Sequence, residues 1–185
     1  MSVKPVIEQQ DVSSSVLHQP SVGLANAVEF EAFLRVHDRA VRSMACRLVG
    51  DDVDDVLQVA YLKAFEQRGS FRGEASPRTW LYTIAYRTAL DHLRSRRRRV
   101  AGAHRAATLT VVADRAEAVA DRMAVTTALA SLPVDQRVIL LLIDGQDMSY
   151  DDAAIVLGIA NGTIASRLHR ARTAIRTALE GNEEQ

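Results

Sequence analysis

The sequence is poor in several residue types, and each shortage limits what the chain can be. Its 185 residues include one cysteine, Cys46, so no intrachain disulfide can form. The helical pattern around Cys46 predicts a small buried or half-buried side chain rather than a redox or metal-binding thiol. The five histidines show no metal-ligand spacing with it, and no metal or cofactor is expected. Aromatic residues make up 5% of the chain, so its cores should be mainly aliphatic.

Long apolar segments are also missing. No run of about 18 apolar residues is present, so no membrane span is expected. The N-terminus lacks the apolar stretch of a signal peptide, and we therefore expect a cytoplasmic protein. Glycine and proline are scarce, with 9 and 4 residues, while alanine, leucine and arginine abound. This composition favours an all-α protein.

The chain has no net charge, because 23 basic residues balance 23 acidic ones. A neutral chain is not expected to bind polyanions indiscriminately. Basic character is local instead, and it peaks in a run of arginines formed by Arg94, Arg96, Arg97, Arg98 and Arg99. Such cations suit the C-terminal end of a helix dipole, but five exceed what a helix end needs. We therefore favour phosphate binding for this arginine run.

The acidic residues cluster elsewhere, at Asp51, Asp52, Asp54 and Asp55. Carboxylates at this density can hold Mg²⁺ or Ca²⁺. They can also stabilise the N-terminal end of a helix. We favour the second interpretation, because the cluster opens a stripe of apolar residues at helical spacing that runs to Phe65.

Three helices are predicted in the first part of the chain. One carries an apolar stripe from Phe30 to Leu48 and ends at Gly50, the second follows the acidic cluster, and the third runs from Arg78 to about Arg98. A glycine- and serine-rich loop from Gln67 to Pro77 separates the last two. In this loop Phe71 stands beside Arg72, a pairing that suits the holding of an unstacked base. Packing of Phe71 into the core is an equally good interpretation of the sequence alone.

The most informative run of the sequence lies near the C-terminus. Ser149 precedes a short helical pattern, Gly158 marks a tight turn, and a second helix extends from about Asn161 to Arg176. Two short helices joined by a glycine turn are typical of a helix-turn-helix motif, whose second helix enters the DNA major groove. The cap and the turn favour this interpretation over an ordinary amphipathic surface helix.

The second helix of this motif has two unlike faces. Ile164, Leu168 and Ala171 share an apolar face that would dock the helix. The opposite face carries Gly162, Ser166, His169, Arg170, Thr173 and Arg176. Ser166 and Arg170 are the best candidates for base reading, while Arg167 and Arg172 on the flanks suit phosphates.

The order of these motifs resembles the extracytoplasmic-function sigma factors of the bacterial sigma-70 family. The resemblance rests on Asp55-Val56-Leu57-Gln58 with Leu62-Lys63-Ala64-Phe65, then Phe71-Arg72-Gly73-Glu74, Thr79-Trp80-Leu81-Tyr82 and Asp91-His92-Leu93-Arg94. In the second part it rests on Leu132-Pro133, Gln136-Arg137 and the run from Ser149 to Arg172. It covers about residues 28–99 and 118–180.

The resemblance implies a protein that binds core RNA polymerase and directs it to promoter DNA, with no covalent chemistry of its own. Polymerase docking is expected at Asp55, Gln58, Leu62 and Lys63. Melting of the −10 element is expected at Phe71, Arg72, Trp80, Arg87, Arg94, Arg96, Arg97 and Arg98. Reading of the −35 duplex is expected at Thr163, Ser166, Arg167, His169, Arg170, Arg172 and Thr173. Family members often have an anti-sigma factor, so one is a candidate partner here.

The implied architecture is two small helical domains joined by a linker. A flexible tail would cover residues 1–27, and a domain of three or four helices with the docking and −10 functions would cover 28–99. Residues 100–117, whose periodicity is weak, would form the linker. A four-helix domain with the helix-turn-helix motif and the −35 function would cover 118–180.

Four positions depart from the family pattern, and one of them is Ala160, which begins a turn where proline is common. Val59 stands where a glutamate is usual, Arg87 where an asparagine is usual, and Ala165 where a basic residue is common. One polar docking interaction and one DNA interaction of the family would be missing here. Arginine prefers guanine or phosphate where asparagine reads adenine, so the −10 preference should also differ.

A helix-turn-helix regulator that acts without polymerase is the alternative. It has no need of the Phe71 loop or the arginine run. A hydrolytic enzyme would need a nucleophile and base, or a ligand set, that the sequence does not offer.

Overall fold

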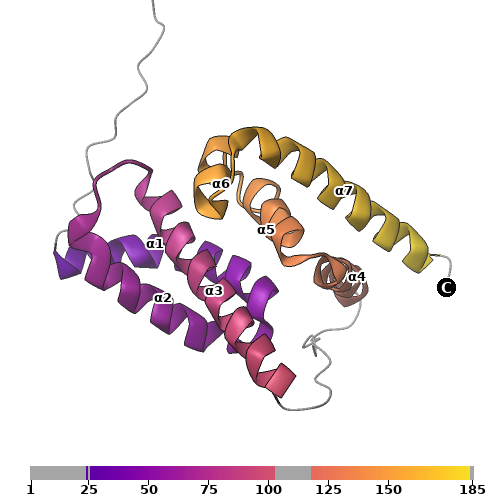
Figure 1. The fold of residues 1–185 in the computed structure, drawn as a ribbon, viewed down its shortest axis with the longest axis horizontal. Coiled ribbons are helices and arrows are strands. Elements are labelled where there is room, and N and C mark those ends of the chain that lie inside the picture. Colours follow the sequence, from indigo (N-terminus) through magenta and orange to yellow (C-terminus); the bar gives the residue numbers. More distant parts are fainter. Residues whose placement is uncertain (1–23, 25, 103–117, 184–185) are drawn as a thin grey trace, which may run out of the picture.

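The computed structural model describes residues 24, 26–102 and 118–183. Its helices are α1 (Ala27–Val49), α2 (Val53–Gln67), α3 (Pro77–Gly102), α4 (Ala118–Ser131), α5 (Val134–Ile143), α6 (Tyr150–Leu157) and α7 (Asn161–Glu183). Short 3₁₀ turns cover Gly50–Asp52 and Arg68–Ser70 (Figure 1). These residues contain no strand, which confirms the predicted all-α class. None of their helices is both long and apolar enough to cross a membrane.

The first three helices form one unit, and local sequence signals set their ends. The side chain of Asn26 caps α1 by accepting a hydrogen bond from the Glu29 amide at 2.8 Å. Gly50 ends the helix with a φ of 64°, a conformation that glycine adopts without strain. Asp54 and Asp55 lie in the first turn of α2, where negative charge favours the helix dipole.

The third helix is the centre of the first unit. Leu81, Tyr82, Ala85 and Ala89 on α3 are fully buried, and α3 packs against both α1 and α2. It continues to Gly102, so the predicted linker of residues 100–117 begins inside this helix. The rest of that linker lies outside the described residues, as does most of the predicted tail. Leu24 of the tail is described, and it is buried in the core.

The last four helices form the second unit around α5. The side chains from Val138 to Leu142 are buried, which agrees with their continuous apolar run. Ile164, Leu168 and Ala171 of α7 are buried as well. This confirms the prediction that the apolar side of α7 packs against the rest of the protein. The helix runs to Glu183, farther than the sequence predicted.

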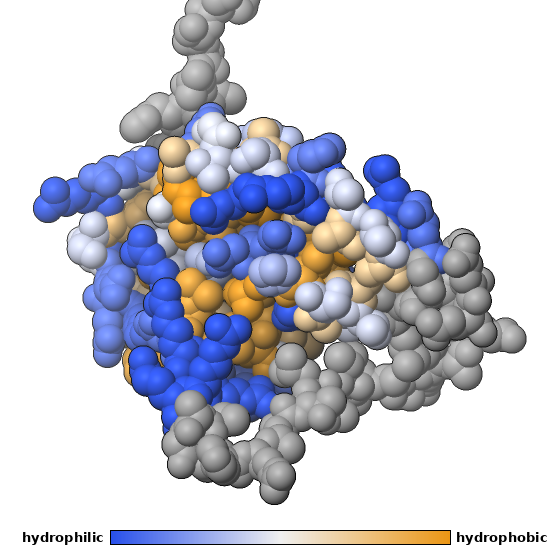
Figure 2. Space-filling view, turned by 45° about the vertical axis from the view of Figure 1, so that its right-hand side comes forward, coloured by the Kyte–Doolittle hydropathy of each residue, from blue (hydrophilic) through white to orange (hydrophobic). Residues whose placement is uncertain are grey.

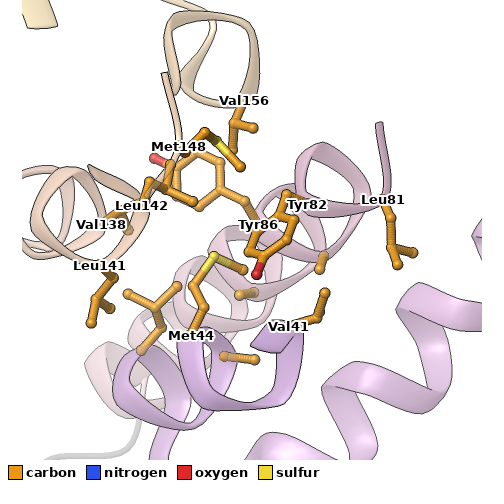
Figure 3. Close-up of a cluster of buried hydrophobic side chains, with 14 of the residues drawn as sticks. Val41, Met44, Leu81, Tyr82, Tyr86, Val138, Leu141, Leu142, Met148 and Val156 are labelled. Carbon is orange, nitrogen blue, oxygen red and sulfur yellow. The ribbon is translucent and has the colours of Figure 1, made fainter. Parts of the chain in front are cut away.

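The two units pack against each other. Helix α3 contacts α6, and α1 contacts α4 and α5, so the buried residues form one continuous cluster. Figure 3 shows Tyr82 and Tyr86 of the first unit beside Met148 and Val156 of the second. The contact is incomplete, because a groove of about 640 Å³ remains between α1 and the second unit. In space-filling view, one face of the molecule has an apolar area bordered by hydrophilic side chains (Figure 2).

The structure corrects two predictions about single side chains. Cys46 was expected to be buried or half-buried, but it is exposed on α1. Phe65 was placed on the buried stripe of α2, yet it lies at the edge of the core. Its ring centroid lies 5.6 Å from that of Phe30 in a T-shaped arrangement, and the Arg68 guanidinium lies over the Phe65 ring, 3.7 Å from its centroid.

Candidate nucleic-acid interface

The helix-turn-helix motif is formed by α6 and α7. Ser149 caps α6 by accepting a hydrogen bond from the Asp152 amide at 3.1 Å. Gly158 ends α6 in the left-handed conformation, with a φ of 65°, and the chain turns through Ile159 and Ala160 into α7. These are the cap and the turn that the sequence predicted.

The outward face of α7 carries the predicted base-reading residues. Ser166, His169, Arg170 and Thr173 are all exposed, and Thr163 is half-buried at the start of the helix. The Ser166 hydroxyl donates to the Thr163 carbonyl, and Arg170 Nε donates to the Ser166 carbonyl, so both side chains bond to the backbone of their own helix. Bonds of this kind are exchanged readily when a stronger acceptor arrives. The face is therefore available to a DNA groove.

The two flanking arginines of α7 are engaged by acids of the second unit. Arg172 Nε donates to Asp144 at 3.0 Å, with a second bond between the same groups. This hydrogen bond and the neighbouring carboxylate charge raise the pKa of Arg172. Arg167 lies 3.9 Å from Asp135. Both guanidiniums are held at the flanks of α7, the position that the sequence predicted for phosphate contacts.

A second candidate surface lies in the first unit, where the loop after α2 meets the start of α3. The rings of Phe71 and Trp80 lie 5.5 Å apart, and both side chains are half-buried. They line a hollow of about 450 Å³ together with Ser70, Arg72, Glu74, Ala75, Thr83 and Ile155. Phe71 packs against the core and also lines the hollow. Its position therefore agrees with both interpretations of the sequence, which were packing into the core and the holding of an unstacked base. An aromatic pair with adjacent polar groups suits the stacking of a base.

The arginine run lies on the C-terminal half of α3 and divides into two groups. Arg94 pairs with Asp91, while Arg96 lies 3.4 Å from Asp52, whose carboxylate also contacts His92 Nε2 at 2.9 Å. Arg97, Arg98 and Arg99 are exposed, and they form no ion pair with the acids that the structure describes. The predicted −10 residue Arg87 is exposed on the same helix, about two turns before this run begins.

The predicted docking face on α2 carries both polar and apolar side chains, and most of them are exposed. Asp55 and Gln58 are exposed, Leu62 is 57% exposed, and Lys63 is half-buried. Val59, noted only as a departure from the family pattern, is 46% exposed on this face. Phe65 was missed as a member of the face, because its place on the apolar stripe of α2 suggested the core. Uncovered apolar side chains at this spacing are typical of a protein-binding surface.

Sequence reasoning also missed the residues that join the two units. Thr79 and Tyr82 of α3 donate hydrogen bonds to Asp152 and Gln146 of the second unit, at 2.8 Å in each case. No local pattern marks such residues, since a hydroxyl or an amide between helices is common everywhere on a protein.

Comparisons with known proteins agree with this division. Residues 33–99 match the Sigma-70 region 2 family, and residues 122–175 match the Sigma-70 region 4 family. The chain is 40% identical over 156 residues to the ECF RNA polymerase sigma factor SigM of Mycobacterium tuberculosis, covering 81% of this chain and 76% of SigM. It is 32% identical over 153 residues to the ECF RNA polymerase sigma-E factor of Escherichia coli, covering 75% of this chain and 80% of the relative.

Two solved structures have a similar fold. The sigma factor RpoE, in complex with the anti-sigma factor NepR from Bartonella quintana, superposes with a TM-score of 0.73 at 29% identity. The match covers 82% of this chain and 97% of RpoE. CnrH, in complex with the cytosolic domain of CnrY, gives a TM-score of 0.64 at 23% identity, covers 86% of this chain and 93% of CnrH, and supports the fold alone.

Proposed function

The chain belongs to the extracytoplasmic-function sigma factors of the sigma-70 family, and we propose that it directs core RNA polymerase to specific promoters. Two reading surfaces in one chain carry this conclusion. One is the polar face of α7, which fits duplex DNA, and the other is the hollow beside Phe71 and Trp80, which fits an unstacked base. A regulator that binds only duplex DNA needs the first surface and has no use for the second.

The roles divide between the units. In the second unit, Ser166 and Arg170 would contact base edges of the −35 element, with Thr163, His169 and Thr173 beside them. Arg167 and Arg172 would contact the DNA backbone, because arginine binds phosphate bidentately. In the first unit, Phe71, Arg72 and Trp80 would hold a flipped base of the −10 element. Arg87, Arg94 and Arg96–Arg98 would then follow the backbone of the opening duplex.

The exposed face of α2 would dock onto core polymerase. Leu62, Val59 and Phe65 provide apolar area there, and Asp55, Gln58 and Lys63 provide polar contacts at its border. Val59 in place of the usual glutamate makes this face more apolar than the family pattern. The proposal places the protein in the cytoplasm with the polymerase, and it assigns no covalent chemistry to the chain.

An anti-sigma factor is a third proposed partner. The RpoE structure is a complex with the anti-sigma factor NepR, and the match to this chain covers 97% of RpoE. We extend that partner class, and not any particular contact, to this chain. The likeness to CnrH adds only the fold.

Transcription in vitro tests the proposal. Purified core polymerase and a library of randomised promoters are incubated with the protein, and the transcribed templates are sequenced. We expect transcripts only when core and protein are both present, with a shared pair of elements near −35 and −10. If no template is transcribed and the protein alone binds a palindromic duplex, the regulator alternative replaces this proposal.

A further inference from the structure

The four aspartates around the start of α2 have different neighbours. Asp54 forms an ion pair with α1, whereas Asp52 contacts α3. Asp51 and Asp55 are exposed, and neither pairs with a cation that the structure describes. Negative charge at a helix start explains acids in the first turn of α2. It does not explain the contacts of Asp52, whose side chain forms no cap bond to α2.

A single oxygen of Asp52 accepts hydrogen bonds from two side chains of α3. His92 Nε2 lies 2.9 Å from Asp52 Oδ2, and Arg96 Nη1 lies 3.4 Å from the same oxygen. The two donors are four positions apart, so they lie on one side of α3 and on successive turns. All three side chains are partly exposed, and water therefore keeps the energy of the contact modest. The contact thus orients these turns of α3 but contributes little to the stability of the whole protein.

The contact acts on a part of α3 that the core does not hold. Among the described side chains of this helix, Ala89 is the last that is buried, and Leu93 is the last that packs against the core. Every side chain from Arg94 to Arg99 is polar or charged. The C-terminal end of α3 reaches beyond α1 and α2 (Figure 1). Of the side-chain hydrogen bonds that the structure describes, those to Asp52 are the ones that join this end to another element.

The end of α3 that Asp52 holds carries the free cations of the arginine run. Arg97, Arg98 and Arg99 follow Arg96 directly and pair with none of the described acids. They begin about 25 Å along the helix from Trp80, at roughly 1.5 Å per residue. Over this length, a bend or a loss of the last turns would move the guanidiniums away from a duplex whose base lies in the hollow beside Trp80. Arginines that are held in place before binding also lose less side-chain entropy.

The Asp52 carboxylate has the wrong charge for a contact with DNA. A negative group repels phosphates within about 10 Å at 0.1 M salt. Beside the arginine run it therefore weakens DNA binding directly, and any benefit to DNA binding comes through the residues that it holds. Arg96 remains able to contact a phosphate, because a guanidinium has five N–H donors and Asp52 accepts from one nitrogen of the group.

We propose that Asp52 is a positioning residue for promoter opening. It acts through His92 and Arg96, and it holds the end of α3 in the direction that brings Arg97 and Arg98 to the DNA backbone while a base lies in the hollow. Asp52 itself touches no DNA. The role in promoter opening rests on the proposed function, whereas the hold on α3 does not depend on it.

Three alanine variants of the same acidic cluster form the test. Asp52→Ala removes the acceptor of both bonds from α3 and costs α2 no cap bond. Asp54→Ala is the matched control, because it removes an acid that pairs with α1 and not with α3. Asp51→Ala measures the effect of the charge alone, since Asp51 pairs with no described cation. Asp52→Glu keeps the carboxylate and should behave as the unsubstituted protein does.

Hydrogen exchange of the backbone amides in the free, full-length protein measures the hold on α3. We expect the amides of residues 95–99 to exchange about three to five times faster in Asp52→Ala than in the unsubstituted protein, the effect of one partly exposed ion pair. Asp54→Ala should leave them unchanged. Equal exchange in Asp52→Ala and the unsubstituted protein would overturn the proposal.

Promoter opening by the holoenzyme gives the functional readout, and its direction separates positioning from electrostatics. Loss of a negative charge alone favours binding to phosphates, so Asp51→Ala should open promoters as well as the unsubstituted protein or better. Asp52→Ala should instead lower the open fraction at limiting holoenzyme about three- to fivefold, and Asp52→Glu should restore it. Permanganate reactivity near −10 measures the open fraction, and a pull-down measures binding to core polymerase, which we expect to be equal in all variants.

Two results of this experiment would overturn the proposal. One is an Asp52→Ala protein that opens promoters as well as Asp51→Ala does, which would leave only the charge effect. The other is an equal loss of core binding and opening in Asp52→Ala, which would make Asp52 a structural residue of the whole unit. Failure of the proposed function would show differently, as absence of transcription with the unsubstituted protein, and hydrogen exchange would still decide whether Asp52 holds α3.

Discussion

The two units of this protein differ in their content of aromatic residues. All but one of its phenylalanine, tyrosine and tryptophan residues lie between Phe30 and Tyr86, in the first unit. The core of the second unit is aliphatic, and its aromatic residue, Tyr150, is exposed. Most of these rings of the first unit are core residues, while Phe71 and Trp80 line the hollow that is proposed to hold an unstacked base. Unstacked bases need aromatic faces, while an intact duplex needs hydrogen-bonding groups on a helix that fits its groove.

The arginines of the two units also differ, in whether acidic residues pair with them. The exposed arginines at the end of α3 pair with none of the acids that the structure describes, which leaves them for phosphates of a changing backbone. In the second unit Asp135 and Asp144 hold Arg167 and Arg172 at fixed places on α7. Arginines whose positions are already fixed bind a rigid groove more favourably, because they lose less side-chain entropy on binding.

The largest expected effect tests whether the second unit depends on its own core. Leu168→Ala removes a side chain that is 1% exposed, and it should lower the free energy of unfolding by about 2–5 kcal/mol. Circular dichroism follows the helices of both units. We expect the Leu168→Ala protein to lose its dichroism at a lower temperature than the unsubstituted protein. The exposed Val125→Ala change is the control, and a Leu168→Ala melting curve equal to that of the control would contradict the packing described.

The next effect is on promoter melting. Phe71→Ala should weaken the hold on a flipped base by about 1–3 kcal/mol, the usual worth of one stacked base. Binding to core polymerase should be unchanged, because Phe71 lies outside the exposed face of α2. Permanganate reactivity of thymines near −10 gives the open fraction, and a pull-down of core gives the binding. If the Phe71→Ala protein opens promoter DNA normally, the Phe71 ring packs in the core and holds no base.

A similar or smaller effect is expected in duplex recognition. Arg170→Ala should weaken selection of the −35 element by about 1–3 kcal/mol and relax the preference at one base pair. The comparison is Arg176→Ala, which changes an exposed arginine of the same helix almost two turns away. Transcription from a library randomised at −35 measures the preference. If Arg176→Ala relaxes the preference and Arg170→Ala does not, the helix sits in the groove in another register.

Salt dependence separates the two groups of arginines. Arg97→Ala with Arg98→Ala should lower the salt slope of promoter binding by about one unit for each phosphate that is no longer neutralised. Sequence preference should stay the same, because phosphates carry no base identity. Binding titrations of the holoenzyme at several salt concentrations give the slope. An unchanged slope would show that Arg97 and Arg98 contact no phosphate and are only solvated side chains at the end of α3.

The smallest expected effect is a change in stability that the tyrosines of the first unit cause only in alkaline solution. Burial, then the charge of Asp135, raises the pKa of Tyr86 to about 12, and burial also raises the pKa of Tyr82. Folding therefore favours the neutral phenols. The stability they contribute is complete below about pH 10, the ordinary tyrosine pKa, and is lost as pH rises through the folded value.

In alkaline solution the first unit should accordingly unfold before the second, as followed by Trp80 fluorescence. Tyr86→Phe should reduce this loss of stability. A protein whose second unit unfolds first at high pH would contradict the assignment.

The sequence predicted the helices and both faces of the recognition helix well, because periodicity and capping are local signals. Gly50 and Gly158 end helices where the sequence predicted, and Leu168 faces inward. The placement of Phe65 and Cys46 failed, since a stripe on one helix does not reveal how far its neighbours extend over it. The contact of Thr79 with Asp152 could not be predicted, because it joins residues 73 positions apart through ordinary polar groups.

Permanganate footprinting of one transcribed promoter tests the central claim most directly, since it requires polymerase docking and both reading surfaces together. With core polymerase and the protein, thymines near −10 should become reactive, and a changed −35 element should abolish the reactivity. Neither component alone should open the duplex. A duplex that stays closed with both components present, or one that the protein opens without polymerase, would contradict the account.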